Sequence, residues 1–99
     1  MAEEKVYDLE ERTFLFANNI RVFVNKIDQS IWNKEDIKQL VRSSGSVAAN
    51  YIEANKKLGE KDFLMKIKIC KKECKESLLW LKLLDLSNKE LEKRTNNFN

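Results

Sequence analysis

Apolar and small side chains recur three and four residues apart between residues 61 and 86, and this spacing constrains the fold more than any other feature. The series consists of Phe63, Ile67, Cys70, Cys74, Ser77, Leu81 and Leu84. Such alternation puts side chains on one side of an α-helix, as in helical bundles. It predicts a helix over about residues 61–86, with Ser77 as the weakest position of its packing line.

Two earlier segments show the same helical period. The first covers about residues 8–28, where Asp8 is a suitable N-cap. The second covers about residues 34–57, with Asn33 as the expected N-cap and Gly59 as the expected stop. Both segments are therefore predicted to be helices that pack beside the helix over 61–86.

A fourth segment covers residues 89–99, after Ser87 or Asn88 as a cap. At about 1.5 Å per residue it could span only about 16 Å, whereas the preceding helix spans about 39 Å. Much of a groove would stay uncovered. We expect either that the chain is a shortened form of something longer, which we favour, or that another subunit fills the gap.

Composition agrees with an all-helical fold. The 99 residues include no proline, two glycines and 42% hydrophobic residues, which suits long helices around a single modest core. The predicted fold is all-α: one domain over residues 1–99, an up-and-down antiparallel four-helix bundle whose fourth helix is short or truncated.

Localisation follows from what the sequence lacks. No apolar run follows the polar N-terminus, and no stretch approaches the roughly 20 apolar residues of a membrane span. We expect a cytoplasmic protein with no membrane partner. Cys70 and Cys74, four apart on one helix, are expected to be free thiols that serve as small core residues.

The residue types argue against catalysis. Histidine is absent, which removes the commonest general base and zinc ligand. Two cysteines do not complete a zinc site, and no glycine-rich phosphate loop occurs. We therefore expect no enzyme activity, no catalytic residue, no metal, no cofactor and no small-molecule substrate.

Two surfaces point instead to partners. The helix over 61–86 has a second apolar face, which needs a second partner and consists of Met65, Ile69, Trp80 and Leu83. The preceding helix carries a polar stripe of Arg42, Ser46, Asn50 and Glu53. This stripe is either a solvated face or a hydrogen-bonded contact with a neighbouring helix or subunit. Lys72 and Glu76 are spaced to pair with each other or across an interface.

A row of lysines occupies a third sector of the helix over 61–86. This lysine stripe consists of Lys61, Lys68, Lys71, Lys75 and Lys82. It could track the phosphates of RNA or DNA. The alternative is a solvated face, since no aromatic side chains interleave with the lysines to stack bases.

Several motifs resemble one known family. They are the run from Tyr7 to Thr13, the run Gln39 to Ala54 (QLVRSSGSVAANYIEA), and the segments Lys61-Asp62-Phe63 and Lys71 to Ser77, followed by Trp80-Leu81. These motifs, over about residues 7–86, resemble the bacterial four-helix bundle proteins of the 23S rRNA intervening-sequence family.

The resemblance implies a ring-shaped homopentamer with no established enzymatic activity and a poorly defined cellular role. A related group, the accessory proteins of diversity-generating retroelements, binds nucleic acid and a reverse transcriptase through a basic pentamer surface. Carried over to this chain, the family motifs include Arg42, Asn50, Glu53, Lys72, Glu73 and Glu76. The resemblance implies that these residues form a polar network, structural or at a subunit interface.

Together these features predict a non-enzymatic, homo-oligomeric scaffold, which we expect to be a pentamer. Its basic surface is expected to bind RNA or DNA weakly and without base specificity. The alternative is an accessory subunit that docks a specific protein such as a reverse transcriptase. The predicted oligomer or polar-network residues are Arg42, Ser46, Asn50, Glu53, Lys72, Glu73, Glu76 and Trp80.

Overall fold

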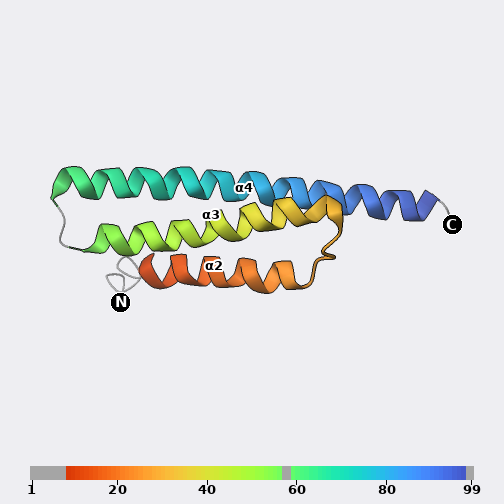
Figure 1. Ribbon diagram of the computed structural model, residues 1–99, viewed down its shortest axis with the longest axis horizontal. Coiled ribbons are helices and arrows are strands. Elements are labelled where there is room, and N and C mark those ends of the chain that lie inside the picture. The colour runs from red at the N-terminus through yellow and green to blue at the C-terminus, as the bar shows by residue number, and fades with distance from the viewer. Residues whose placement is uncertain (1–8, 57–58, 98–99) are drawn as a thin grey trace, which may run out of the picture.

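Three helices make up the described part of the chain. The computed structural model describes the backbone of residues 9–56 and 59–97, and the side chains of residues 9–56 and 59–84. Within these ranges lie α2 (Leu9–Asn25), α3 (Ile31–Asn55) and α4 (Glu60–Asn97), and no strand. Along the chain, successive helices run in opposite directions (Figure 1). The prediction of an all-α fold is confirmed.

The predicted break between a third and a fourth helix is wrong. α4 continues through Ser87 and Asn88 to Asn97. Serine and asparagine cost at most about 0.7 kcal/mol each in a helix interior, and neither glycine nor proline follows Gly59. Nothing in this stretch ends the helix, so the described residues form three helices and not the predicted four-helix bundle. Phe98 and the side chains of residues 85–97 lie outside the described part.

The start of α3 also differs from the prediction. Ser30, in extended conformation, is the N-cap, so α3 begins at Ile31 and not after Asn33. Asn33 is buried in the first turn and donates its side-chain amide to the carbonyl of Asp28 at 3.2 Å. It thus ties the α2–α3 connection to α3 without capping the helix.

The end of α3 does not depend on Gly59. Lys56 takes an extended conformation and ends the helix at Asn55, and the predicted last residue, Lys57, lies outside the described part. Gly59 instead precedes α4, where its carbonyl accepts a hydrogen bond of 3.0 Å from the backbone N–H of Phe63. The glycine therefore marks the start of the next helix.

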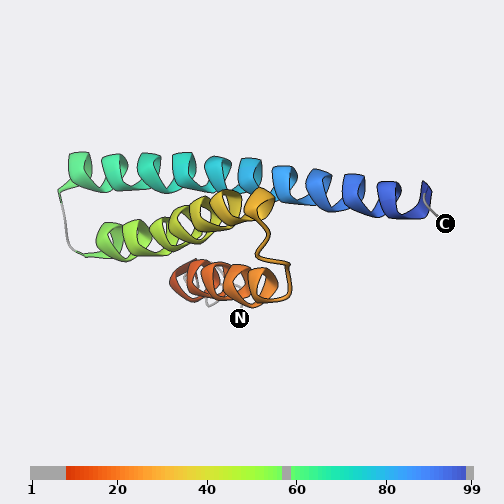
Figure 2. The same cartoon turned by 45° about the vertical axis from the view of Figure 1, so that its right-hand side comes forward.

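The helices lie side by side in one layer with α3 in the middle (Figure 2). The Cα atoms span 59 × 29 × 16 Å. A core cluster joins all three helices and consists of Ile20, Val24, Ile37, Leu40 and Leu84. α4 is longer than α3, about 57 Å against about 38 Å, so its end projects beyond the other helices (Figure 1).

Gly45 leaves room on α3 for the guanidinium of Arg21, which comes from α2. A Cβ atom at this position would lie 3.0 Å from Nη2 of Arg21. The Arg21 guanidinium reaches across Gly45 to donate to the carbonyl of Val41 at 3.3 Å and also donates to the carbonyl of Ala17 at 2.9 Å.

None of the helices in the described residues has both the length and the apolar character to cross a membrane.

Candidate functional site

Polar side chains meet at the contact between α3 and α4. Nη1 of Arg42 donates to Oε2 of Glu73 at 3.3 Å, and Nη2 donates to Oε2 of Glu76 at 3.4 Å. Nε donates to Gln39 at 3.2 Å, and Gln39 in turn donates to Glu35 at 3.1 Å. The structure thus brings together Arg42, Glu73 and Glu76, three of the residues predicted to share a polar network.

The carboxylate of Glu73 is the most buried charge of this network. Its side chain is 11% exposed, whereas that of Arg42 is 51% exposed. A buried carboxylate is costly unless it is paired and hydrogen-bonded. Arg42 therefore supports the contact between α3 and α4 by compensating Glu73, while its own outer half stays in solvent.

Two serine hydroxyls form the centre of the same contact. Oγ of Ser43 and Oγ of Ser77 lie 2.8 Å apart, and both residues are fully buried. Ser77 can donate to the carbonyl of Glu73 at 2.9 Å while it accepts from Ser43. Ser77, predicted to be the weak point of the packing line, is thus a satisfied buried contact. Ser43 and Ser77 each interrupt a row of apolar residues on their helix. This pair of serines is the sequence signal that could have identified the contact.

The remaining predicted network residues lie apart from this cluster. Asn50 donates to the carbonyl and hydroxyl of Ser46 at 2.9 and 3.0 Å, both within α3. Glu53 pairs with Lys56 at 3.2 Å. Trp80 is half-buried against the apolar core, and its buried Nε1 lacks a hydrogen-bond partner among the described residues.

The lysine stripe lies on the side of α4 that faces away from α3. All five of its residues, Lys61, Lys68, Lys71, Lys75 and Lys82, are exposed. At about 100° per residue, this sector is opposite to the buried residues Glu73, Ser77 and Leu84. Lys72 lies among these lysines, and a shallow depression is lined by Lys68, Lys71, Lys72, Lys75 and Glu76. The structure therefore gathers four positive charges beside one carboxylate on an open surface.

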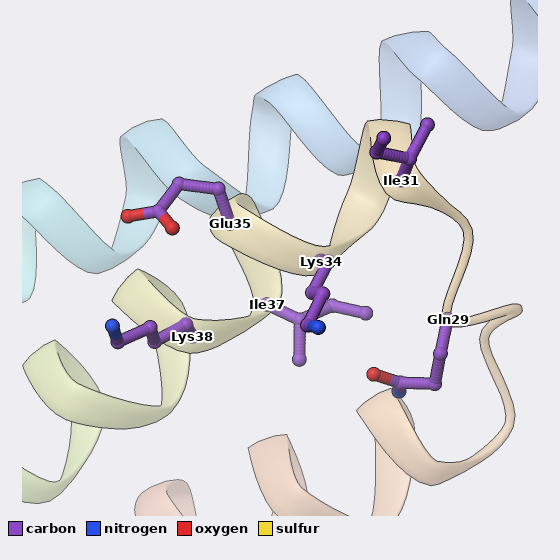
Figure 3. Close-up of a pocket in the computed structure, with 6 residues that line it drawn as sticks. All are labelled: Gln29, Ile31, Lys34, Glu35, Ile37 and Lys38. Carbon is purple, nitrogen blue, oxygen red and sulfur yellow. The ribbon is translucent and has the colours of Figure 1, made fainter.

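A second depression lies where α2 turns into α3 (Figure 3). It is lined by Gln29, Ile31, Lys34, Glu35, Ile37 and Lys38. Its carboxylate, Glu35, already accepts a hydrogen bond from Gln39. Its lining residues do not include a nucleophile paired with a general base. Elsewhere in the described residues, no group of three or more Cys, Asp or Glu is placed to hold a metal ion.

The two cysteines have different surroundings. Cys74 is exposed, so the prediction that both cysteines are core residues is wrong for it. Cys70 and Cys74, at i and i+4, are neighbours on one side of α4, and Cys70 is the one that contacts α3. Sγ of Cys70 donates to the carbonyl of Val47 at 3.5 Å. Burial raises the pKa of the Cys70 thiol above its ordinary value of 9.0.

The sequence matches one family of known proteins. A family model described as 23S rRNA-intervening sequence protein matches residues 6–98. Neither a curated protein nor a solved structure matches the chain. The match includes the whole of the polar contact between α3 and α4 and the whole lysine stripe.

Replacing Arg42 tests the polar contact. We expect Arg42→Ala to lower the free energy of unfolding by about 1–3 kcal/mol, because it leaves the buried Glu73 carboxylate unpaired. The double variant Arg42→Ala/Glu73→Gln should lose less than the sum of the single losses, measured by urea unfolding. Lys56→Ala, which removes an exposed pair, should change stability by at most about 1 kcal/mol. Strictly additive losses would contradict a coupled pair.

Thiol labelling tests the difference between the cysteines. Alkylation at pH 8 should modify Cys74 well before Cys70, because the thiolate is the reacting form and burial raises the pKa of Cys70. Peptide mass spectrometry after timed quenching gives the two rates. In urea the rates should converge, and equal rates in the folded protein would contradict the burial of Cys70.

Proposed function

Because the chain belongs to the 23S rRNA-intervening sequence protein family, we propose that it is a non-enzymatic, self-associating helical scaffold. In this proposal the lysine stripe holds the phosphate backbone of RNA or DNA, weakly and without reading bases. The observation that carries the proposal is the amount of apolar surface that three helices in one layer leave uncovered.

Large apolar side chains are exposed on every described helix. Phe14 on α2 is 56% exposed, Ile52 on α3 is 44% exposed and Met65 on α4 is 52% exposed. So many half-exposed large apolar side chains on a small chain favour an interface with a partner. The predicted second apolar face fits this picture in part, since Met65 and Leu83 are exposed whereas Ile69 and Trp80 are half-buried.

A single layer also leaves room for a further helix. An up-and-down four-helix bundle has two layers, and residues 9–56 and 59–97 supply three helices in one. A helix from a second copy that packs against α2 and α4 would complete such a bundle. In our proposal the copies close into a ring, a homopentamer, in the cytoplasm.

Charge supports the nucleic-acid part of the proposal. The lysine stripe extends over about 32 Å of α4 and faces away from the protein's own core. Lysines that neutralise phosphates release counter-ions, so binding of this kind weakens steeply with salt. No aromatic residue interleaves with the lysines, so contact with the backbone fits better than stacking on bases.

A second candidate function is an accessory subunit that docks a protein such as a reverse transcriptase, as in the retroelement accessory proteins. The half-exposed leucines among the lysines favour it, because phosphates do not bind apolar side chains. Leu64 is 50% exposed and Leu79 is 49% exposed. A single stoichiometric protein partner, with no retention of the chain on nucleic acid, would support this candidate.

Solution mass tests self-association. Light scattering at micromolar concentration should give a multiple of the 11.7 kDa chain mass, five-fold for the pentamer. Phe23→Glu should lower this mass at unchanged helix content, because it places a charge on an exposed apolar position of α2. Asn19→Glu, an exposed polar position on the same helix, should not. A wild-type monomer would contradict the scaffold.

Charge reversal tests nucleic-acid binding. The triple variant Lys68→Glu, Lys71→Glu and Lys75→Glu should lose at least ten-fold in affinity for mixed RNA at 50 mM salt, measured by fluorescence anisotropy. Wild-type affinity should fall again between 50 and 200 mM salt. The control reverses Lys34, Lys38 and Lys56, which are exposed and lie outside α4. Equal losses in both triple variants would mean that net charge alone matters.

A further inference from the structure

Four lysines form a nearly straight row on the outward face of α4, the side that faces away from α3. They follow one another at intervals of seven residues, which give a rise of about 10.5 Å and a rotation of only about 20° per interval. The row therefore runs close to parallel with the helix axis for about 32 Å, and all four side chains are exposed. This central row consists of Lys61, Lys68, Lys75 and Lys82.

Apolar side chains flank the central row on both sides. Leu64 and Leu78 lie about 50° to one side of the row, as follows from about 100° per residue. Met65 and Leu79 lie about 50° to the other side. All four are between 49% and 52% exposed. The outward face of α4 thus combines a line of positive charge with apolar surface along each of its edges.

The charges in the middle of this face are available to an external anion. A shallow depression there is lined by Lys68, Lys71, Lys72, Lys75 and Glu76. The carboxylate of Glu76 accepts a hydrogen bond from Arg42 at 3.4 Å. None of the four lysines pairs with a carboxylate among the described side chains of residues 9–56 and 59–84. Phosphates can therefore reach these lysines without displacing a carboxylate of this part of the chain.

A strand within a duplex does not follow such a row. Each strand of B-form DNA advances about 3.4 Å per phosphate and completes a turn in about 10 base pairs. Over about 10.5 Å of the duplex axis, the interval between two lysines of the central row, the strand therefore winds through nearly a third of a turn. A straight row meets a winding strand over only part of its length. The paired bases also face inward, where the leucines cannot contact them.

A single strand fits both the row and its flanks. Its backbone has no fixed helical path, so successive phosphates can follow the central row. Its bases are unpaired, and each has an apolar face that can lie against a leucine or methionine beside the row. Every base has such a face, so this contact is tolerant of sequence. It therefore agrees with binding that lacks base specificity.

We infer that the outward face of α4 binds a single strand of RNA or DNA in preference to a duplex, with phosphates on the central row and bases against its apolar flanks. This inference rests on the proposed nucleic-acid binding by the lysine stripe, and it names the form of nucleic acid that the stripe takes. It gives the half-exposed leucines a role that phosphate contacts do not. The preference is opposite to the one that charge alone would give, since a duplex carries two phosphate strands.

A comparison of strand and duplex tests the preference on the unaltered protein. A fluorescent DNA strand without self-complementarity and its blunt duplex are titrated in parallel at 50 mM salt, with anisotropy as the readout. The single strand should bind about five-fold more tightly or better. Equal or tighter binding of the duplex would overturn the inference and leave the nucleic-acid function standing. If neither form binds, the proposed function itself fails.

Substitution of the flanking leucines tests the contact with bases. Leu64→Gln/Leu79→Gln keeps the charge of α4, and glutamine has a helix propensity close to that of leucine. This variant should bind the single strand about three-fold more weakly or worse. An abasic strand of the same length, which has phosphates but no bases, should bind within about two-fold of wild type. Retained binding of the abasic strand also shows that the variant is folded.

The matched control changes two apolar side chains of similar exposure on the other helices. Leu15 on α2 is 42% exposed and Ile52 on α3 is 44% exposed. Leu15→Gln/Ile52→Gln should leave the ratio of the affinities for the two strands, normal and abasic, as in wild type. If Leu64→Gln/Leu79→Gln also leaves this ratio unchanged, the bases do not contact the leucines and the inferred mode of binding is wrong.

Discussion

The contact between α3 and α4 through Ser43 and Ser77 determines how the other surfaces of the molecule are oriented. Their hydroxyls are 2.8 Å apart and fully buried, which requires two small side chains and a close approach of the helix backbones. This contact fixes how α4 is rotated about its own axis. The Arg42–Glu73 pair beside it reinforces the same rotation, because a buried carboxylate must keep its partner. The lysine stripe faces outward as a consequence.

Three helices in one layer cannot bury their own apolar surface. Among the described helices, α3 is covered on two sides, whereas α2 and α4 each pack mainly against α3. Phe14, Leu15 and Val22 on α2 are therefore exposed, as are Leu64 and Leu78 on α4. The same geometry that holds the lysines in solvent leaves these apolar residues uncovered. The exposed apolar residues and the exposed lysines are thus two consequences of one arrangement, and both features support the proposed scaffold.

The sequence by itself determined the all-α class, because helical spacing in three long segments and the absence of proline left no other regular structure. It also placed Arg42, Glu73 and Glu76 in a polar cluster, through the family motifs, and the lysines in one sector, through their spacing. The structure corrected the sequence reading at Ser87 and Asn88, which α4 passes through, since weak local signals do not end a helix that lacks glycine and proline. It likewise separated Asn50, Glu53 and Trp80 from the cluster and buried Ser77, because a helical period shows which residues share a face but not which neighbour that face meets.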